Sequence, residues 1–440
     1  MGREYRAGRK SFSEEEIMTG IQKKQRLLTM IFGAFAIFFT GYPHVWSIYQ
    51  PYVMEQAGWS QGQASMCFYL ALSTFVFGNI VGGRMQNRFK EKTIVWIGGG
   101  IFAAGILASA FLIVPTPLPM YLSYGVMQGF GQGMIYTVIL ATVQRWFPDR
   151  TGFASGVVVT ANGLCGFFLA PLSRKLLEAE GVQKTFLIIG AAITVSWILC
   201  SIFFQAPDKS LVNAGGSAAK SGTSEMKQYT SGEMMRTRNF YLLLATMFFG
   251  LISYFMVSPV SQTYQIDLGI PSAVAVSAVM LGSIVNAGAR LVLPTLADKV
   301  GRIVCIKGVL IVAVIAMGVL AVSRSLAVTV AVVLMYGCYG GIMGSFPSLT
   351  SSIFGMKHTG ENYGFVMFGI VFATFGAPAI SGLVSSKGYE MNVVFGIGAV
   401  FAVIAFVCLT LLGRNLVKEH VEKSAGVKND TAQVSKPQAE

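Results

Sequence analysis

The sequence has few charged residues. Only 12% of its 440 residues are Asp, Glu, Lys or Arg, whereas 53% are hydrophobic. A soluble domain carries about 25% charged residues. This composition therefore excludes an ordinary soluble enzyme or binding domain. A mean hydropathy of +0.61 is typical of a protein that crosses a membrane several times.

The patterns of catalytic and cofactor chemistry are also missing. The apolar segments hold no paired carboxylates, no HExxH-like metal ligands and no set of residues resembling a catalytic nucleophile with its base. The Gly-rich stretch 129–133 lacks the strand-then-helix context of a nucleotide-binding loop. The six cysteines all fall in apolar runs, which predicts buried thiols rather than disulfides or a metal site. We therefore expect no enzyme activity and no cofactor or metal.

A cleavable signal peptide is not expected either. The first 26 residues are polar, and the apolar run that follows them is too long for a signal-peptide core. That run is the first of twelve that are long enough to cross a bilayer, called spans 1 to 12 in chain order. Their approximate limits are 27–50, 62–83, 93–114, 119–144, 152–173, 184–205, 239–265, 273–297, 303–322, 327–352, 362–385 and 391–413.

The chain divides into two halves of six spans each. We predict an all-α membrane protein whose twelve transmembrane helices form two pseudo-symmetric six-helix bundles. The predicted domains are an N-terminal tail (1–26), a first bundle (27–205), a polar linker (206–238), a second bundle (239–413) and a C-terminal tail (414–440). Two parallel halves with a site at their interface, near mid-membrane, are a transporter design.

The positive charge is distributed according to this topology. The formal net charge is +13, and 27 of the 33 Lys and Arg residues fall on the side of the membrane that holds both tails and the linker. Positively charged loops stay in the cytoplasm. We therefore expect a multi-pass protein of the cell (inner or plasma) membrane with both termini cytoplasmic, and no nucleic-acid partner.

Arg290 is a permanent charge inside span 8. Such a charge costs roughly 3 kcal/mol on membrane insertion and usually marks a substrate path. The alternative is a structural ion pair, but no predicted span carries Asp or Glu near mid-depth. Asn286 shares the helix face of Arg290, can hold the guanidinium by a hydrogen bond, and is a further candidate for the substrate site. We predict that Arg290 binds an anionic substrate.

Other polar and aromatic side chains in the spans are candidates for the same substrate site, although helix packing explains each of them as well. They are Trp46 and Tyr49 in span 1, Gln132 and Tyr136 in span 4, Tyr254 in span 7, and Tyr336 and Tyr339 in span 10. His44 is the only histidine inside a span. It is a candidate for proton coupling, because histidine titrates near neutral pH. A hydrogen bond to a neighbour is the alternative.

The loop motifs resemble those of the major facilitator superfamily. The segment 298–302 is similar to its cytoplasmic Gly-x-x-x-Asp-Arg-x-Gly-Arg signature, with Pro294 in the place of the usual Gly. The loop after span 2 is a weaker copy with Asn87 in the Asp position. The resemblance implies two alternating halves and a gating role for charges in the cytoplasmic loops, unless these charges only set the topology. The gating candidates are Arg84, Arg88, Asp149, Arg150, Asp298 and Arg302.

Further motifs resemble the oxalate–formate antiporter family, from about Leu27 to Arg414. They are Gly41–Tyr49 in span 1, Gln144–Arg150 after span 4, Phe346–Thr350 in span 10 and Asn362–Gly364 in span 11. This family is close to the monocarboxylate transporters, and both carry an Arg in span 8. The resemblance therefore implies that Arg290 is the substrate cation.

Two departures from these families bear on the choice of substrate and on proton coupling. The oxalate exchanger uses a second cation, a Lys in span 11, but span 11 here has no Lys or Arg. A second substrate carboxylate would be desolvated without a partner, so we favour a monocarboxylate. In the monocarboxylate transporters an Asp precedes the Arg by four residues, and here that position is Asn286. Asn cannot carry a proton, which puts this route of proton coupling in doubt.

We therefore predict a secondary carrier for a small carboxylate such as lactate, pyruvate, formate or acetate, working by alternating access. Oxalate–formate exchange is the alternative, and a non-transporting membrane sensor of the same fold is a more remote one. The expected partners are the carboxylate anion, protons or a counter-anion, and the lipid bilayer. We expect a monomer. The choice of acid, and the choice between symport and antiport, stay open.

Overall fold

The computed structural model describes residues 20–148, 150–207 and 227–434. Helices make up nearly all of the regular structure in these ranges, and no strand occurs in them. The predicted all-α class is thereby confirmed. Asp149, one of the predicted gating residues, lies outside the described residues.

Eleven helices in these ranges are long and apolar enough to cross a membrane. One of them, α8 (Thr151–Phe203), has 53 residues and contains both span 5 and span 6. A straight helix of that length would measure about 80 Å, far more than a bilayer core of ~30 Å. The backbone of α8 leaves helical geometry at Gly181, where φ is 76° and ψ is 172°. Two spans that meet at Gly181 account for the difference between eleven and twelve.

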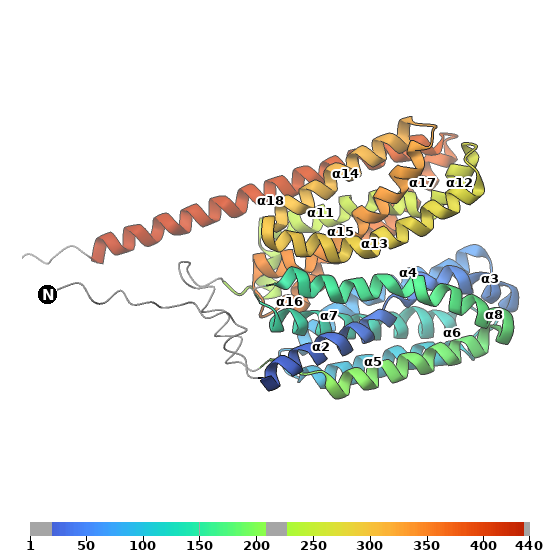
Figure 1. Cartoon of the computed structure of the whole chain (residues 1–440), viewed down its shortest axis with the longest axis horizontal. Helices are drawn as coiled ribbons and strands as arrows, with labels where there is room; N and C mark the ends of the chain where they lie inside the picture. Colours follow the sequence, from blue (N-terminus) through green and yellow to red (C-terminus); the bar gives the residue numbers. More distant parts are fainter. Residues whose placement is uncertain (1–19, 149, 208–226, 435–440) are drawn as a thin grey trace, which may run out of the picture. The chain divides into compact units, whose positions relative to one another are not determined.

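The contacts divide the chain into two compact units. The first consists of Met1–Gln228 and Thr350–Gly364. Its long helices pack as a bundle, with α4 against α7, α2 against α8, and α5 against both α7 and α8 (Figure 1). Besides α8, the elements of this bundle and their bounds are α2 (Gly20–Phe39), η1 (Tyr42–Val45), α3 (Trp46–Ala57), α4 (Gln61–Met85), α5 (Glu91–Ser109), α6 (Leu118–Met120), η2 (Tyr121–Gln128) and α7 (Gly129–Trp146).

Glycine brings α4 and α7 into backbone contact. A Cβ atom on Gly133 would collide with the backbone of Phe75, and one on Gly129 with the backbone of Ala71. Small residues allow this approach between membrane helices, where lipid removes the hydrophobic drive for association. The glycines of span 4 therefore fix the position of the helix that carries Gln132 and Tyr136.

Span 1 is not a continuous α-helix. Between α2 and α3 the chain forms the short 3-10 helix η1, whose second residue is Pro43. Proline lacks the N–H that would continue the helix ladder. In span 4, the neighbouring segment η2 is a π-helix, and it runs directly into α7.

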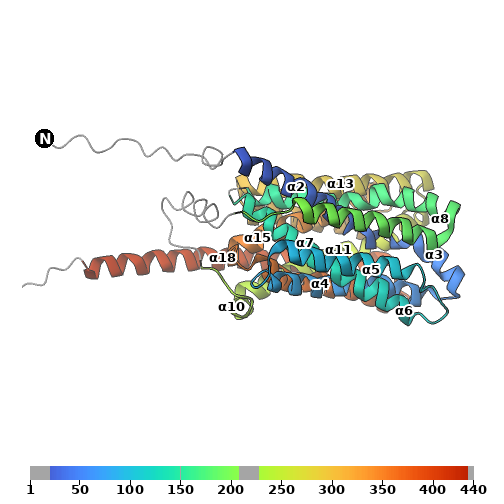
Figure 2. The same ribbon diagram turned by 90° about the horizontal axis from the view of Figure 1, so that it is seen from below.

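The second unit consists of Tyr229–Leu349 and Phe365–Glu440. In it α11 packs against α17 and α18, and α14 packs against α18 (Figure 2 gives a second view). The helix α18 continues beyond the bundle of its own unit as a long rod, drawn in red in Figure 1. The elements and their bounds are α10 (Ser231–Met235), α11 (Arg238–Val257), η3 (Ser258–Val260), α12 (Ser261–Asp267), α13 (Ser272–Val300), α14 (Arg302–Val322), α15 (Ala327–Phe354), α16 (Thr359–Val366), α17 (Phe368–Ser386) and α18 (Met391–Val434).

Part of the predicted second bundle groups with the first unit. The segment Thr350–Gly364 lies against α4, because Gly83 and Gly360 let the two backbones touch. Thr137 Oγ1 also donates a hydrogen bond of 3.0 Å to the carbonyl of Gly360. The domain limits 27–205 and 239–413 stay a prediction.

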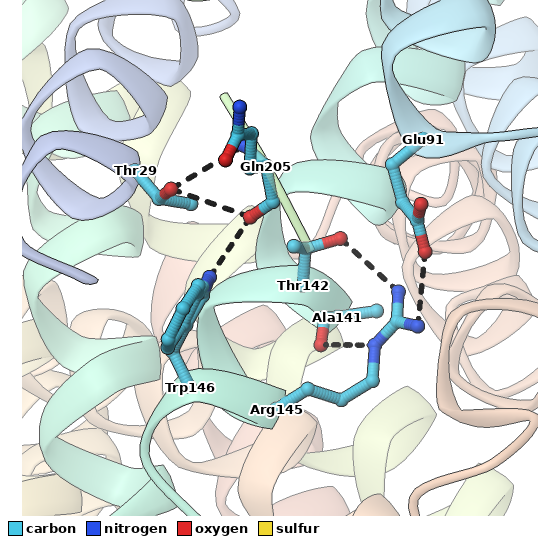
Figure 3. A network of polar contacts seen from close by, with 7 residues as sticks. All are labelled: Thr29, Glu91, Ala141, Thr142, Arg145, Trp146 and Gln205. Carbon is cyan, nitrogen blue, oxygen red and sulfur yellow. Dashed lines mark hydrogen bonds and ion pairs between the residues drawn. The ribbon is translucent and has the colours of Figure 1, made fainter. Parts of the chain in front are cut away.

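The end of α8 is tied to spans 1 and 4 by a polar network (Figure 3). Trp146 Nε1 donates to the carbonyl of Gln205 at 2.8 Å, and Thr29 Oγ1 donates to the same oxygen at 3.3 Å. Nearby, Arg145 pairs with Glu91 at 3.0 Å, joining α7 to the first turn of α5. The segment that follows span 6 is therefore held against α2 and α7 of the first unit.

Candidate functional site

Arg290 is the buried charge at the centre of the candidate site. It lies on α13 and is only 2% exposed. Its Nε donates a hydrogen bond of 3.1 Å to Asn286 Oδ1, one helical turn earlier. The hydrogen bond expected from the four-residue spacing is therefore present.

An aromatic ring supports the guanidinium. Arg290 Cζ lies 5.4 Å from the centroid of the Tyr339 ring on α15. This distance falls within the range of about 6 Å over which cations are attracted to aromatic faces. Tyr339 itself is 5% exposed. Two of the side chains that the sequence proposed for the substrate site, Tyr339 and Asn286, therefore contact Arg290.

Two further predicted residues lie behind Tyr339. The ring of Tyr254, on α11, stacks on Tyr339 with centroids 4.2 Å apart and an angle of 14° between the planes. Tyr336 packs edge-on against Tyr254 at 5.4 Å and 88°. Tyr254 and Tyr336 therefore belong to the same cluster as Arg290, although the ring that lies under the guanidinium is that of Tyr339.

Glycines on α15 bring this cluster close to α13. A Cβ on Gly344 would lie 2.6 Å from the carbonyl oxygen of Arg290, and one on Gly340 would collide with the backbone of Asn286. On the other helix, a Cβ on Gly282 would lie 2.9 Å from the ring of Tyr336. The sequence of α15 therefore sets how closely Tyr339 and Arg290 approach each other.

The first unit places its own candidates in two groups. Trp46 and Tyr49 lie in an aromatic cluster with Tyr42 and Tyr124, with Trp46 and Tyr124 centroids 4.5 Å apart. Trp46 Nε1 donates to the carbonyl of Ala64 at 3.0 Å, and the Tyr49 hydroxyl is 3.0 Å from Ser173 Oγ. Both predicted residues therefore use their polar atoms within this unit.

Gln132 and Tyr136, on α7, form the second group. Gln132 Nε2 donates to the carbonyl of Thr40, where α2 ends, and its Oε1 accepts from Gln128 Nε2. Asn162 Nδ2 donates to Thr40 Oγ1 at 3.0 Å. Gln132 therefore satisfies a carbonyl next to the break in span 1. Tyr136 is 2% exposed and packs edge-on against Phe75 at 5.2 Å.

His44, the proton-coupling candidate, lies in η1 and is exposed. Its ring packs edge-on against Phe68 of α4, with centroids 6.2 Å apart. It therefore sits directly at the break in span 1, beside Pro43.

The described gating candidates differ in their contacts and in their exposure. Asp298 accepts a hydrogen bond of 3.1 Å from Arg302 across the turn at Gly301, whose φ of 100° favours glycine. Arg84 pairs with Glu361 at 2.8 Å. Arg88 and Arg150 are exposed.

Glu361 is not among the residues that the sequence predicts for the site or the gate. It is 6% exposed and lies in the first turn of α16, next to the Asn362–Gly364 motif. The sequence does show an acidic residue at the start of an apolar span. It does not reveal the partner on α4, because 277 positions separate the two residues in sequence.

Comparison with known proteins places this arrangement in a family. The family model of the Major Facilitator Superfamily matches residues 28–375. The oxalate:formate antiporter of Oxalobacter formigenes is 26% identical over 377 residues, which are 85% of this chain and 88% of that protein. Monocarboxylate transporter 11 of Homo sapiens is 28% identical over 230 residues, 52% of this chain and 47% of that protein. The resemblance to both groups of transporters is thereby confirmed.

A solved structure agrees on the fold. The outward conformation of FucP, a Major Facilitator Superfamily transporter, superposes with a TM-score of 0.68 over 88% of this chain and 99% of that chain. At 14% identity, this likeness concerns the fold alone. Taken with the family match and the apolar helices, these findings show that the chain is a membrane-spanning transporter and belongs to the Major Facilitator Superfamily.

Proposed function

We propose that the protein is a secondary carrier for small monocarboxylates, such as lactate, pyruvate, formate or acetate, and that Arg290 binds the substrate carboxylate. The observation that carries this proposal is the buried Arg290, which Asn286 and Tyr339 hold within an apolar span. A guanidinium fork and a carboxylate form two parallel charge-assisted hydrogen bonds. Keeping such a cation in the membrane is costly, so a functional role is the expected reason for it.

The number of carboxylates on the proposed substrate follows from the number of cations in the spans. Span 11, which is formed by α16 and α17, contains no Lys or Arg. One guanidinium neutralises one carboxylate, and a second carboxylate would lose its hydration without gaining a partner. We therefore place monocarboxylates before dicarboxylates. Asn286 Oδ1 accepts from Arg290, and an amide cannot take the proton that an Asp would carry there.

The remaining first-unit candidates are assigned supporting roles in this proposal. Tyr136 is the candidate for a hydroxyl that donates to the substrate, and Trp46 and Tyr49 for aromatic lining. His44 is the candidate for proton coupling, because histidine titrates near neutral pH. We further propose a cell-membrane location with both termini in the cytoplasm, from the excess of Lys and Arg on that side.

Oxalate–formate type exchange is the second candidate function. The relative from Oxalobacter formigenes favours it, because it is matched over 85% of this chain and is named an oxalate:formate antiporter. The two candidates differ in their requirement for a second cation, and span 11 is the place where this chain lacks one.

Uptake into proteoliposomes separates the two functions. Purified protein is reconstituted, and the initial uptake of labelled formate, acetate, pyruvate, L-lactate and oxalate is measured at two pH values, with empty liposomes as the control. We expect at least one monocarboxylate to be taken up faster than oxalate. Oxalate uptake well above all the monocarboxylates would support the exchanger, and uptake of none of the five would refute both.

A further inference from the structure

Span 7 is broken beside the Arg290 cluster. The helix α11 ends at Val257, the 3-10 turn η3 covers Ser258–Val260, and α12 begins at Ser261. The second residue of this turn is Pro259, just as Pro43 is the second residue of the break in span 1. A proline removes a backbone donor and allows a helix to bend at that point. Each half of the chain therefore has a proline-containing break in its first span.

Two hydroxyl contacts join the break in span 7 to tyrosines. Ser258 Oγ donates to the Tyr254 hydroxyl at 3.2 Å, and Ser261 Oγ is 3.4 Å from the Tyr336 hydroxyl. Ser261 Oγ also donates to the carbonyl of Ser258 at 3.0 Å, which ties the two ends of the turn together. The two serines that flank Pro259 and Val260 each contact one ring of the Arg290 cluster.

The rings carry this connection on to Arg290. Tyr254 and Tyr336 pack edge to face, and Tyr254 stacks almost parallel on Tyr339. The Tyr339 ring in turn lies below the guanidinium of Arg290. Tyr254 is buried, and the two rings that it packs against, Tyr336 and Tyr339, belong to the same unit. A change in the bend at Ser258 therefore reaches Tyr339 through a single aromatic ring.

We propose that Tyr254 is a positioning residue that couples the break in span 7 to Arg290. This inference rests on the proposed function, because it assumes that Arg290 binds the substrate. Tyr254 holds the plane of Tyr339, and Tyr339 holds the guanidinium. When span 7 bends at Ser258–Val260, the stack shifts and the affinity of Arg290 for a carboxylate changes. Conversely, a bound carboxylate favours the bend that suits the stack, because such coupling is reciprocal.

The coupling is tested by equilibrium binding to the full-length protein. The probes are formate, acetate, pyruvate, L-lactate and oxalate, and the variants are examined with the probe that binds the wild type most tightly. An aromatic pair contributes about 0.5–1.5 kcal/mol beyond its burial, so Tyr254→Leu should weaken binding by about two- to tenfold. Because Tyr254 acts through Tyr339, Tyr254→Leu should add no further loss in a Tyr339→Ala background.

A second pair of variants tests the link to the break. Tyr254→Phe and Ser258→Ala remove the hydroxyl contact but keep the ring stack. We expect both to bind the probe within about twofold of the wild type, since the stack is intact. Their maximal uptake rate should fall while KM is unchanged. The maximal rate is expressed per molecule that binds the probe, because a residue that only stabilises the fold changes the number of such molecules and not the rate of each.

The matched control is Tyr264 on α12 of the same span. Its hydroxyl donates to the carbonyl of Leu320 at 3.0 Å, and its ring packs on that of Phe395. Tyr264→Leu should leave probe binding unchanged. Wild-type affinity in Tyr254→Leu, or a full additional loss on top of Tyr339→Ala, would overturn the proposal.

The same measurements distinguish this proposal from the proposed function. If Arg290→Ala abolishes binding but Tyr254→Leu has no effect, only the coupling is wrong. If none of the five probes binds the wild type, or if Arg290→Ala binds normally, the proposed function is wrong and the coupling falls with it. If Tyr254→Leu does not fold, Tyr254→Phe and Ser258→Ala decide, because normal uptake rates in both contradict the coupling.

Discussion

Arg84 and Glu361 form an ion pair of 2.8 Å although 277 positions separate them in the sequence. The pair fastens the start of α16 to the end of α4. Its two members differ in environment, since the Glu361 side chain is 8% exposed and the Arg84 side chain 65%. The carboxylate therefore depends on Arg84 more than the guanidinium depends on Glu361. Of the gating candidates, Arg84 thus has a partner on a distant segment.

Removing the charge of Glu361 tests this fastening. Glu361→Gln should lower the stability of the protein by about 1 kcal/mol, because exposed ion pairs contribute little and one partner here is buried. The measurement is the apparent melting temperature in detergent. The exchange of both charges, Arg84→Glu with Glu361→Arg, should recover part of the loss.

The control for this prediction is another ion pair. Arg324 and Glu390 are 3.2 Å apart, and both side chains are 71% exposed. Glu390→Gln should therefore leave the melting temperature unchanged. If Glu361→Gln and Glu390→Gln behave alike, the pair at Arg84 has no special role in stability.

The approach of α15 to Arg290 depends on Gly344. Its added Cβ would lie 2.6 Å from the carbonyl oxygen of Arg290, so Gly344→Ala must push the two helices apart. Overpacking of this kind costs typically about 1–3 kcal/mol. We expect a lower melting temperature and carboxylate uptake reduced by about tenfold or more.

Gly288 provides the matched control on α13, two residues before Arg290. A Cβ there meets no atom within 4 Å. Gly288→Ala should therefore keep uptake and should be as stable as the wild type or slightly more stable, since Ala favours helix by about 0.5–1 kcal/mol. Equal loss of uptake in both variants would contradict the packing argument.

Gln132 has two possible roles, which one variant separates. Its side chain donates to the Thr40 carbonyl and accepts from Gln128, so Gln132→Leu leaves buried polar groups without these partners. Such groups cost about 1–3 kcal/mol each. We expect a lower melting temperature with an unchanged affinity of the folded protein for its carboxylate. A loss of affinity at constant stability would instead favour the predicted contact with substrate.

His44 is the test of proton coupling. It lies in the break of span 1 and is exposed. Under the proposed role, His44→Gln abolishes accumulation driven by a proton gradient but spares exchange of carboxylate across the membrane. The measurement is uptake with and without an imposed pH gradient. An unchanged pH dependence would remove His44 from the coupling mechanism.

The hydropathy of the sequence is sufficient to predict the helices but not the breaks within them. Apolar runs of spanning length must be helical in a membrane, because their backbone groups have no water to bind. The break within α8 falls at Gly181 because of local dihedral angles, which composition does not report. Pro43 and Pro259 do signal breaks, but contacts such as those of Gln132 with Thr40 and of Tyr336 with Ser261 join residues that are distant in sequence.

The candidate site could be predicted only as far as local spacing reaches. The contact between Arg290 and Asn286 follows from four-residue spacing on one helix. The stack of Tyr254 on Tyr339 joins α11 to α15 and requires the tertiary packing of the second unit. The contact between Gln132 and Thr40 likewise depends on the place where α2 ends. The structure thus groups some of the candidate residues with Arg290 on α13, and Gln132 with the end of α2.

The central claim is that Arg290 binds a carboxylate, and its most direct test is carboxylate binding to purified Arg290→Ala and Arg290→Lys. Hydrogen bonds to charged groups contribute about 1.5–3 kcal/mol, so Arg290→Ala should bind at least about tenfold more weakly. Arg290→Lys keeps the charge but loses the fork and should also be impaired. Both variants should insert into the membrane normally. Wild-type affinity in Arg290→Ala would contradict the account.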